Sequence, residues 1–308
     1  MTKDLVVKTN RLNTALQNLT LPELRIVQLA IVAARETGKG LNTDTPLRID
    51  AMRYAEVFDT TRQNSYMIMK EAEDSLFNRR FSFIDTDGRV VKSRWIQRVK
   101  YLDNEGAIEL VFTMDVVKGI TRIDGAEEFF TQYLLSQTAV LKSVYSVRLY
   151  ELLTQWRSAK QTPLFDLDMF RGQMGIADNE YKRMDHLKKR VLDLAVEEIN
   201  SKTDLEVSYE QCKRGRVIIG FLFKVRKKTN EKKILDSKSE KIENLLSKLS
   251  DKQIMALSNQ LAADVDFGSR YAYVGENFHQ FSQRIKNEII NGFDVDKYKI
   301  YLNKFGIL

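Results

Sequence analysis

Apolar residues change their spacing along the chain in an order that occurs twice. In the first occurrence they recur every three or four residues from Leu21 to Arg35, which predicts an amphipathic helix. The same spacing predicts a short helix from Ile49 to Phe58 and a longer helix that begins at Thr60 or Thr61. The spacing then changes to two, which predicts strands joined by turns at residues 87–88 and 104–106.

The second half of the chain has the same order of elements. Its spacing predicts a helix from Tyr133 to Trp156, a short helix from Asp166 to Met174, a turn at Gly175 and a long helix from Tyr181 to Asn200. A hairpin follows, and its turn lies near Gly215. A helix, a short helix, a turn, a long helix and a hairpin make up a winged helix, which is a helix-turn-helix followed by a β-wing.

A short sequence repeat marks the start of both helix-turn-helix units. TPLRIDAMRYAEVFD begins at Thr45, and TPLFDLDMFRGQMGI begins at Thr162. The sequence therefore predicts an α+β, mainly helical protein with two tandem winged-helix domains, at residues 1–125 and 126–228. A linker and a small helical C-terminal region are expected at 229–308, either as a partner-binding domain or as an appendage packed on the second winged helix. The alternative interpretation is two unrelated α/β domains with a chance match.

Positive charge is concentrated in two segments. The chain has a net charge of +7, but residues 181–228 carry 13 lysines and arginines against 7 acidic residues, and residues 79–100 carry 7 against 2. These segments hold net charges of +6 and +5, so the remainder of the chain is acidic. Focused positive charge is typical of proteins that bind the phosphate backbone of nucleic acids.

The composition also restricts the cellular location. Apolar residues make up 43% of the chain, which is enough for packed cores, and Cys212 is the only cysteine. The apolar runs are too short to cross a membrane, and charges interrupt the N-terminal segment. We therefore expect a soluble cytoplasmic protein that has no membrane partner.

Four stretches of sequence carry a family pattern. They are LVVKTNRLNTALQNLTLPELRIVQLAI from Leu5, LKSVYSVRLYELL from Leu141, YKRMDHLKKRVLDLAVEEINSKTDLEVSY from Tyr181 and KRGRVIIGFLFKV from Lys213. They resemble the iteron-binding replication initiators (Rep proteins) of theta-replicating bacterial plasmids. The resemblance covers residues 1 to 228 and is more specific in the second winged helix than in the first.

The resemblance implies a function in plasmid replication initiation. Proteins of this type bind direct repeats (iterons) in double-stranded DNA as monomers, and they often dimerise through the first domain to repress their own gene. The resemblance also implies that the chain opens the origin and that its partners include the host initiator, the replicative helicase and chaperones.

The helix from Tyr181 to Asn200 is the predicted recognition helix. Its expected core stripe consists of Met184, Leu187, Val191, Leu194, Ala195 and Ile199. The N-terminal part of such a helix presents side chains to base edges in the major groove, where arginine and lysine pair with guanine. We therefore expect base contacts from Arg183, His186, Lys189 and Arg190.

Phosphate contacts are expected from further cations on the helix, on the wing and in the first domain. They are Lys182, Lys188, Lys213, Arg214, Arg216, Arg79, Arg80, Lys92 and Arg94. The alternative interpretation of all these side chains is a solvated helix face and solvated turns.

Motifs for catalysis are missing from the sequence. The two histidines, His186 and His279, are far apart, and no GxxxxGK[ST] nucleotide-binding loop occurs. One cysteine and two distant histidines cannot provide the spacing of a zinc site. We therefore expect a protein that is not an enzyme and that binds no cofactor or metal.

Two other functions fit the same sequence. A winged-helix transcriptional repressor without a replication role would prefer an inverted repeat, bound by a fixed dimer. A non-specific DNA-binding or partition scaffold would show little preference for any sequence.

Overall fold

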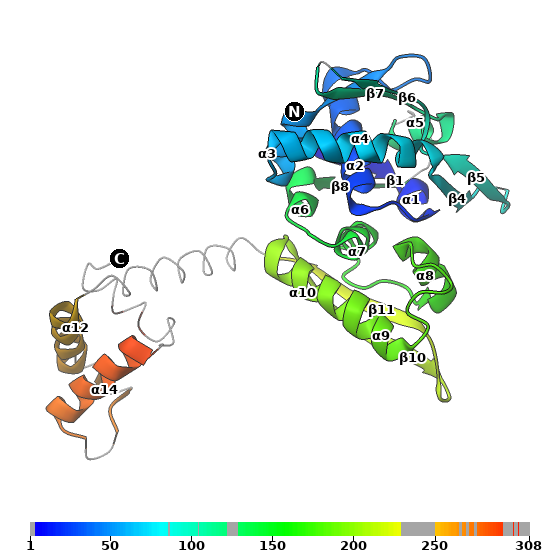
Figure 1. Cartoon of the computed structure of the whole chain (residues 1–308). Helices are drawn as coiled ribbons and strands as arrows, with labels where there is room; N and C mark the ends of the chain where they lie inside the picture. The colour runs from blue at the N-terminus through cyan, green and yellow to red at the C-terminus, as the bar shows by residue number, and fades with distance from the viewer. Residues whose placement is uncertain are drawn as a thin grey trace. The chain divides into compact units, whose positions relative to one another are not determined.

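The computed structural model divides the chain into two compact units, residues 1–227 and residues 228–308 (Figure 1). The structure describes residues 4–85, 87–103, 105–121, 129–228, 250–264, 267–268, 271–273, 276–291, 298 and 301. The predicted linker at 229–249 lies outside the described residues. No described helix has both the length and the apolar character needed to cross a membrane.

Side-chain caps mark the starts of the two long helices of the first winged helix. Helix α2 begins after a capping box in which the Thr20 side chain accepts from the Glu23 amide, and it ends at Gly38 in the left-handed conformation. Thr61 caps α4 in the same way. The helices are α1 (Asn10–Asn13), α2 (Leu21–Thr37), α3 (Ala51–Phe58), α4 (Arg62–Asn78) and α5 (Met114–Ile120).

Two small antiparallel sheets complete the first winged helix, and both predicted hairpins are confirmed. One sheet has the strand order β2-β4-β5 and the other β3-β7-β6. The strands, with β1 at the N-terminus, are β1 (Leu5–Thr9), β2 (Leu16–Gln17), β3 (Leu47–Asp50), β4 (Arg80–Ile84), β5 (Val90–Arg94), β6 (Ile96–Leu102) and β7 (Ala107–Phe112).

The second winged helix repeats the arrangement of the first. Each TPL stretch enters a short strand and then the first helix of the helix-turn-helix, and that strand pairs with the last strand of the following hairpin. The elements are β9 (Phe165–Asp166), α8 (Leu167–Met174), α9 (Met184–Leu187), a π-helical turn η1 (Lys188–Leu192), α10 (Asp193–Lys202), β10 (Leu205–Arg214) and β11 (Val217–Lys227). Two tandem winged helices are thus the fold of residues 4–228, in an α+β architecture.

The single helix predicted from Tyr133 to Trp156 is confirmed only in part. This stretch forms β8 (Phe130–Leu134), α6 (Leu135–Ala139) and α7 (Val144–Thr154). Strand β8 pairs antiparallel with β1, in register from Leu5 and Leu134 to Thr9 and Phe130. A distant partner strand therefore overrides the helical spacing. The predicted boundary at residue 125 stays a prediction, although β8, which follows it, completes a sheet with the N-terminal strand.

A buried ionic cluster joins α7 to the N-terminal elements. The Glu151 carboxylate accepts from Lys8 Nζ at 2.7 Å, Arg148 Nη1 at 2.6 Å, Gln28 Nε2 at 2.9 Å and Tyr133 Oη at 2.5 Å. Burial alone would raise the pKa of Glu151, but the two cations and the hydrogen bonds outweigh it and hold the pKa at about 2. This carboxylate is therefore ionised and fully paired.

The Arg148 guanidinium extends this cluster into the second winged helix. It donates to the carbonyl oxygen of Asn13, before β2, and to the carbonyl oxygen of Gln173, in α8. Buried charges persist only where such partners compensate their lost hydration. The two winged helices are therefore joined by a fixed polar contact within one compact unit.

The C-terminal unit has a core of its own. Its described helices are α12 (Asp251–Ala263) and α14 (Phe278–Asn291), which agree with the predicted helical character of this region. Phe267 lies at the centre of an aromatic group with Tyr271, Phe281, Tyr298 and Tyr301. The small helical C-terminal region therefore folds around its own apolar cluster.

Candidate nucleic-acid interface

The recognition helix begins at Met184, three residues later than predicted. Arg183 is therefore the residue before the first turn, and its guanidinium pairs with Asp185 at 2.7 Å while remaining largely exposed. Lys182 precedes it and is also exposed. Residues 182–190 carry five lysines and arginines and one carboxylate, so the positive charge is concentrated at the start of the helix. His186, Lys189 and Arg190 are exposed on it, and Lys188 is half-buried.

A π-helical turn interrupts this helix at 188–192, and it corrects the predicted core stripe. The Asp193 amide donates to the carbonyl oxygen of Lys188, five residues earlier, so this turn holds one residue more than an α-helical turn. Leu192 is consequently fully buried, whereas Leu194, predicted in the core, is 54% exposed. α9, η1 and α10 run on as one rod (Figure 1).

The turn before the recognition helix is held by an arginine that the sequence did not single out. Arg171 of α8 donates to the carbonyl oxygens of Ala177 at 3.0 Å, Glu180 at 2.6 Å and Tyr181 at 3.2 Å. Gly175 makes the turn after α8 at φ 74°, and an added Cβ would lie 2.7 Å from the carbonyl oxygen of Gln17. The predicted glycine turn is thus confirmed, and Arg171 fixes the segment that follows it.

We expect Arg171→Ala to lower the free energy of unfolding by about 1–2 kcal/mol, because several backbone carbonyls lose their donor. The affinity for a specific DNA site should also fall, because the segment that leads into the recognition helix no longer has a fixed conformation. Thermal unfolding and DNA titration measure the two effects. Arg171→Lys is the matched control, because lysine keeps the charge but cannot fork to three carbonyls. Wild-type behaviour of the lysine variant would contradict the positioning role.

The wing brings three predicted cations together. The β10–β11 hairpin turns at Gly215, which has φ 63°, and Lys213, Arg214 and Arg216 are exposed around this turn. Tyr209 of β10 donates to Asp193 Oδ1 at 2.6 Å and so ties the wing to the recognition helix. No sequence signal pointed to this bond, since its partners are 16 residues apart on different elements.

The cations of the first winged helix divide into two groups. Arg80 and Arg94 are cross-strand partners, and Lys92 lies opposite Ser82, so these three cations share one face of the β4–β5 hairpin. Arg79 instead donates through Nε to both carboxylate oxygens of the buried Glu23, at 2.9 Å each. Arg79 is therefore paired with a buried carboxylate. Arg94 is half-buried and donates through Nη1 to the carbonyl oxygen of Phe77 at 2.9 Å, whereas Arg80 and Lys92 are exposed.

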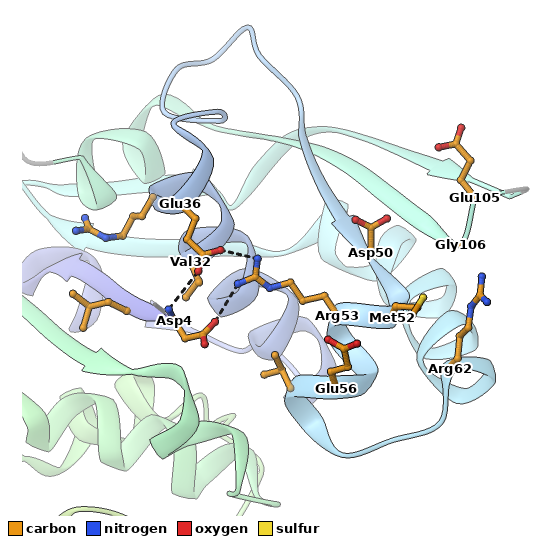
Figure 2. Close-up of a pocket in the computed structure, with 13 residues that line it drawn as sticks. Asp4, Val32, Glu36, Asp50, Met52, Arg53, Glu56, Arg62, Glu105 and Gly106 are labelled. Atoms are coloured by element: carbon orange, nitrogen blue, oxygen red, sulfur yellow. Dashed lines mark hydrogen bonds and ion pairs between the residues drawn. The ribbon is translucent and has the colours of Figure 1, made fainter. Parts of the chain in front are cut away.

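A cavity of about 1080 Å³ lies on the first winged helix, beside α2, α3 and the β6–β7 turn (Figure 2). Arg53 reaches between Asp4 and Glu36, pairing with them at 3.1 Å and 2.7 Å. Five carboxylates line this cavity against three arginines. Its acidic lining is unsuited to phosphate, so the DNA-binding surface is expected elsewhere, on the recognition helix and the wing.

Comparison with known proteins identifies the family. The family model described as "Initiator Replication protein, WH1" matches residues 5–154, and the one described as "Initiator Rep protein, WH2" matches residues 166–225. The chain belongs to the family of initiator replication proteins. The two matches are the two winged helices described above, with α7 at the end of the first.

Two proteins of Escherichia coli are similar to this chain in sequence. A protein of Escherichia coli described as an uncharacterized 27.6 kDa protein is 25% identical over 238 residues, which are 73% of this chain and 95% of the relative. The PI protein of Escherichia coli is 24% identical over 224 residues, which are 64% of this chain and 73% of the relative.

A solved structure shares the initiator fold. The crystal structure of Pi initiator protein in complex with iteron DNA matches this chain with a TM-score of 0.61 and 23% identity, over 73% of this chain and 98% of that chain. The family matches end at residue 225, so the C-terminal unit lies beyond both winged helices of the family.

Proposed function

We propose that the chain is a plasmid replication initiator that binds direct repeats, the iterons, through the recognition helix at 184–202. The observation that carries the proposal is the exposed basic start of this helix, next to a basic wing, in a member of the initiator family. The relative solved on iteron DNA supports the same type of ligand. Base contacts from Arg183, His186, Lys189 and Arg190 remain part of the proposal.

Phosphate contacts come from the surrounding cations in this proposal. They are Lys182 and Lys188 on the recognition segment, Lys213, Arg214 and Arg216 on the wing, and Arg80, Lys92 and Arg94 on the first winged helix. Arg79 is not among the proposed phosphate contacts, because its guanidinium already pairs with the Glu23 carboxylate. Such contacts set the register of the protein on the duplex and strengthen binding at low salt.

Further steps of initiation follow from the family. The chain would open the origin, recruit the host initiator and the replicative helicase with the help of chaperones, and repress its own gene as a dimer. We propose that it does so in the bacterial cytoplasm as a DNA-binding protein, without catalysis of its own. A transcriptional repressor without a replication role is the second candidate, since a winged helix alone serves both functions.

Selection of bound duplexes from a random pool tests the proposal. A single asymmetric site, bound by one chain with a steep salt dependence, supports the initiator. An inverted repeat bound only by a dimer favours the repressor instead. A failure to enrich any sequence would contradict specific recognition and leave the non-specific scaffold.

We expect a chain that ends at Lys227 to fold and to bind the selected repeat with unchanged affinity, because the two compact units have separate apolar cores. Fluorescence anisotropy with labelled repeat DNA measures the affinity of both forms. The matched comparison is the full chain at the same salt concentration. A loss of affinity on truncation would assign part of the DNA-binding surface to the C-terminal unit.

A further inference from the structure

Leu194 is an exposed apolar side chain on the part of the molecule proposed to read bases. It is 54% exposed, although the regular helical spacing places it in the core. The π-helical turn at 188–192 is the cause, because its extra residue buries Leu192 and turns Leu194 outward. Leu194 is therefore on the surface of the helix, although the sequence pattern predicts that it is buried.

The buried residues of the recognition helix show which of its side chains point in the same direction. Leu187, Val191, Ala195 and Ile199 follow one another at intervals of four, and each is at most 1% exposed. Residues four apart therefore point in the same direction along this helix. The row that lies one residue earlier has the same spacing, and it consists of His186, Arg190, Leu194 and Glu198.

Two of the carboxylates near Leu194 accept hydrogen bonds within the protein, whereas a third, Glu197, is exposed. Asp193 accepts from Tyr209 at 2.6 Å. Glu198, four residues further along, accepts from the Lys142 amide at 2.9 Å and from Lys202 Nζ at 2.6 Å. Leu194 lies four residues after Arg190, so its apolar side chain is the next group along the row of His186 and Arg190.

We propose that Leu194 contacts the C5-methyl group of a thymine in the repeat and is a specificity-determining residue. The proposal rests on the proposed function, since it requires this helix to lie in the major groove. The thymine methyl group is the apolar feature of base edges there, and the branched apolar side chain of leucine can cover it. Burial of one methyl group should strengthen binding about fourfold.

The test uses the full chain and the repeat that it selects from a random pool. Each thymine of the repeat is replaced in turn by deoxyuridine, which lacks only the methyl group. For the wild type we expect one replacement to weaken binding about fourfold. Leu194→Ala should bind the thymine repeat about as weakly as the wild type binds that deoxyuridine repeat, and should lose nothing further on replacement.

Val217→Ala is the matched control, because Val217 is another exposed apolar side chain, 67% exposed, on the wing. This variant should keep the deoxyuridine penalty. The inference is overturned if no replacement weakens wild-type binding, or if Leu194→Ala retains the penalty. Failure to select any repeat would instead overturn the proposed function. Thermal unfolding of Leu194→Ala should match the wild type, since the side chain is exposed.

Discussion

Arg190→Ala weakens binding to the selected repeat by about tenfold to a hundredfold and relaxes the base preference at one position. This is the expected result if Arg190 forks onto the O6 and N7 atoms of a guanine, a contact that discriminates by about 1–3 kcal/mol. Arg190 is exposed within the π-helical turn, on the row that includes His186. Titration of the selected repeat and of its single-base variants measures both effects.

Two variants separate base reading from general attraction. Lys213→Ala removes an exposed wing cation and should weaken binding to every sequence equally, with a salt slope smaller by about one. Arg35→Ala removes an exposed arginine on α2 and should leave the affinity nearly unchanged. If Arg190→Ala weakens all sequences to the same extent, as Lys213→Ala does, then Arg190 contacts phosphate rather than a base.

Glu151→Gln should lower the free energy of unfolding by about 3–5 kcal/mol, which is the usual effect of removing one partner of a buried ion pair. The variant keeps the size of the side chain but leaves the buried Lys8 and Arg148 without a carboxylate. Urea denaturation of the full chain, followed by circular dichroism, measures the change. Lys202→Ala breaks the partly exposed pair with Glu198 and should cost about 1 kcal/mol or less.

The same carboxylate makes stability depend on pH in the acid range. The pKa of Glu151 is about 2 in the folded protein, below its ordinary value of 4.5. Its contribution is therefore complete above about pH 5 and is lost as the pH falls toward 2. Glu151→Gln should show a shallower loss of stability over this window than the wild type. Parallel curves for the two proteins would contradict the assignment.

Local signals predicted most helices and hairpins of both winged helices. The apolar spacing from Leu21 to Arg35 and from Asp166 to Met174 is a property of adjacent residues, and the structure contains helices α2 and α8 there. Strand β8 could not be predicted in this way, because its apolar spacing continues into a helix. Its partner β1 lies about 125 residues earlier, and the strand forms only because that partner is present.

The sequence predicted which segments carry the basic residues of the candidate site, but not how the individual side chains are placed. Charge density located the recognition helix and the wing, and the structure brings the wing cations together. A regular helical period places Leu194 in the core, but the structure buries Leu192 there instead. The π-helical turn causes this difference, because its extra residue shifts which side chains face the core. Arg79 resembled its neighbours in sequence, yet its partner Glu23 is 56 residues away. Arg171 was missed because its partners are backbone carbonyls.

The pairing of β1 with β8 has a consequence for the synthesis of the chain. Strand β1 is made first, but its partner at 130–134 and the carboxylate that neutralises Lys8 at residue 151 are made much later. The chain therefore leaves the ribosome with both edges of strand β1 open and Lys8 unpaired until β8 and α7 have emerged. Because such edges attract other chains, this interval is when the nascent protein depends most on protection from aggregation.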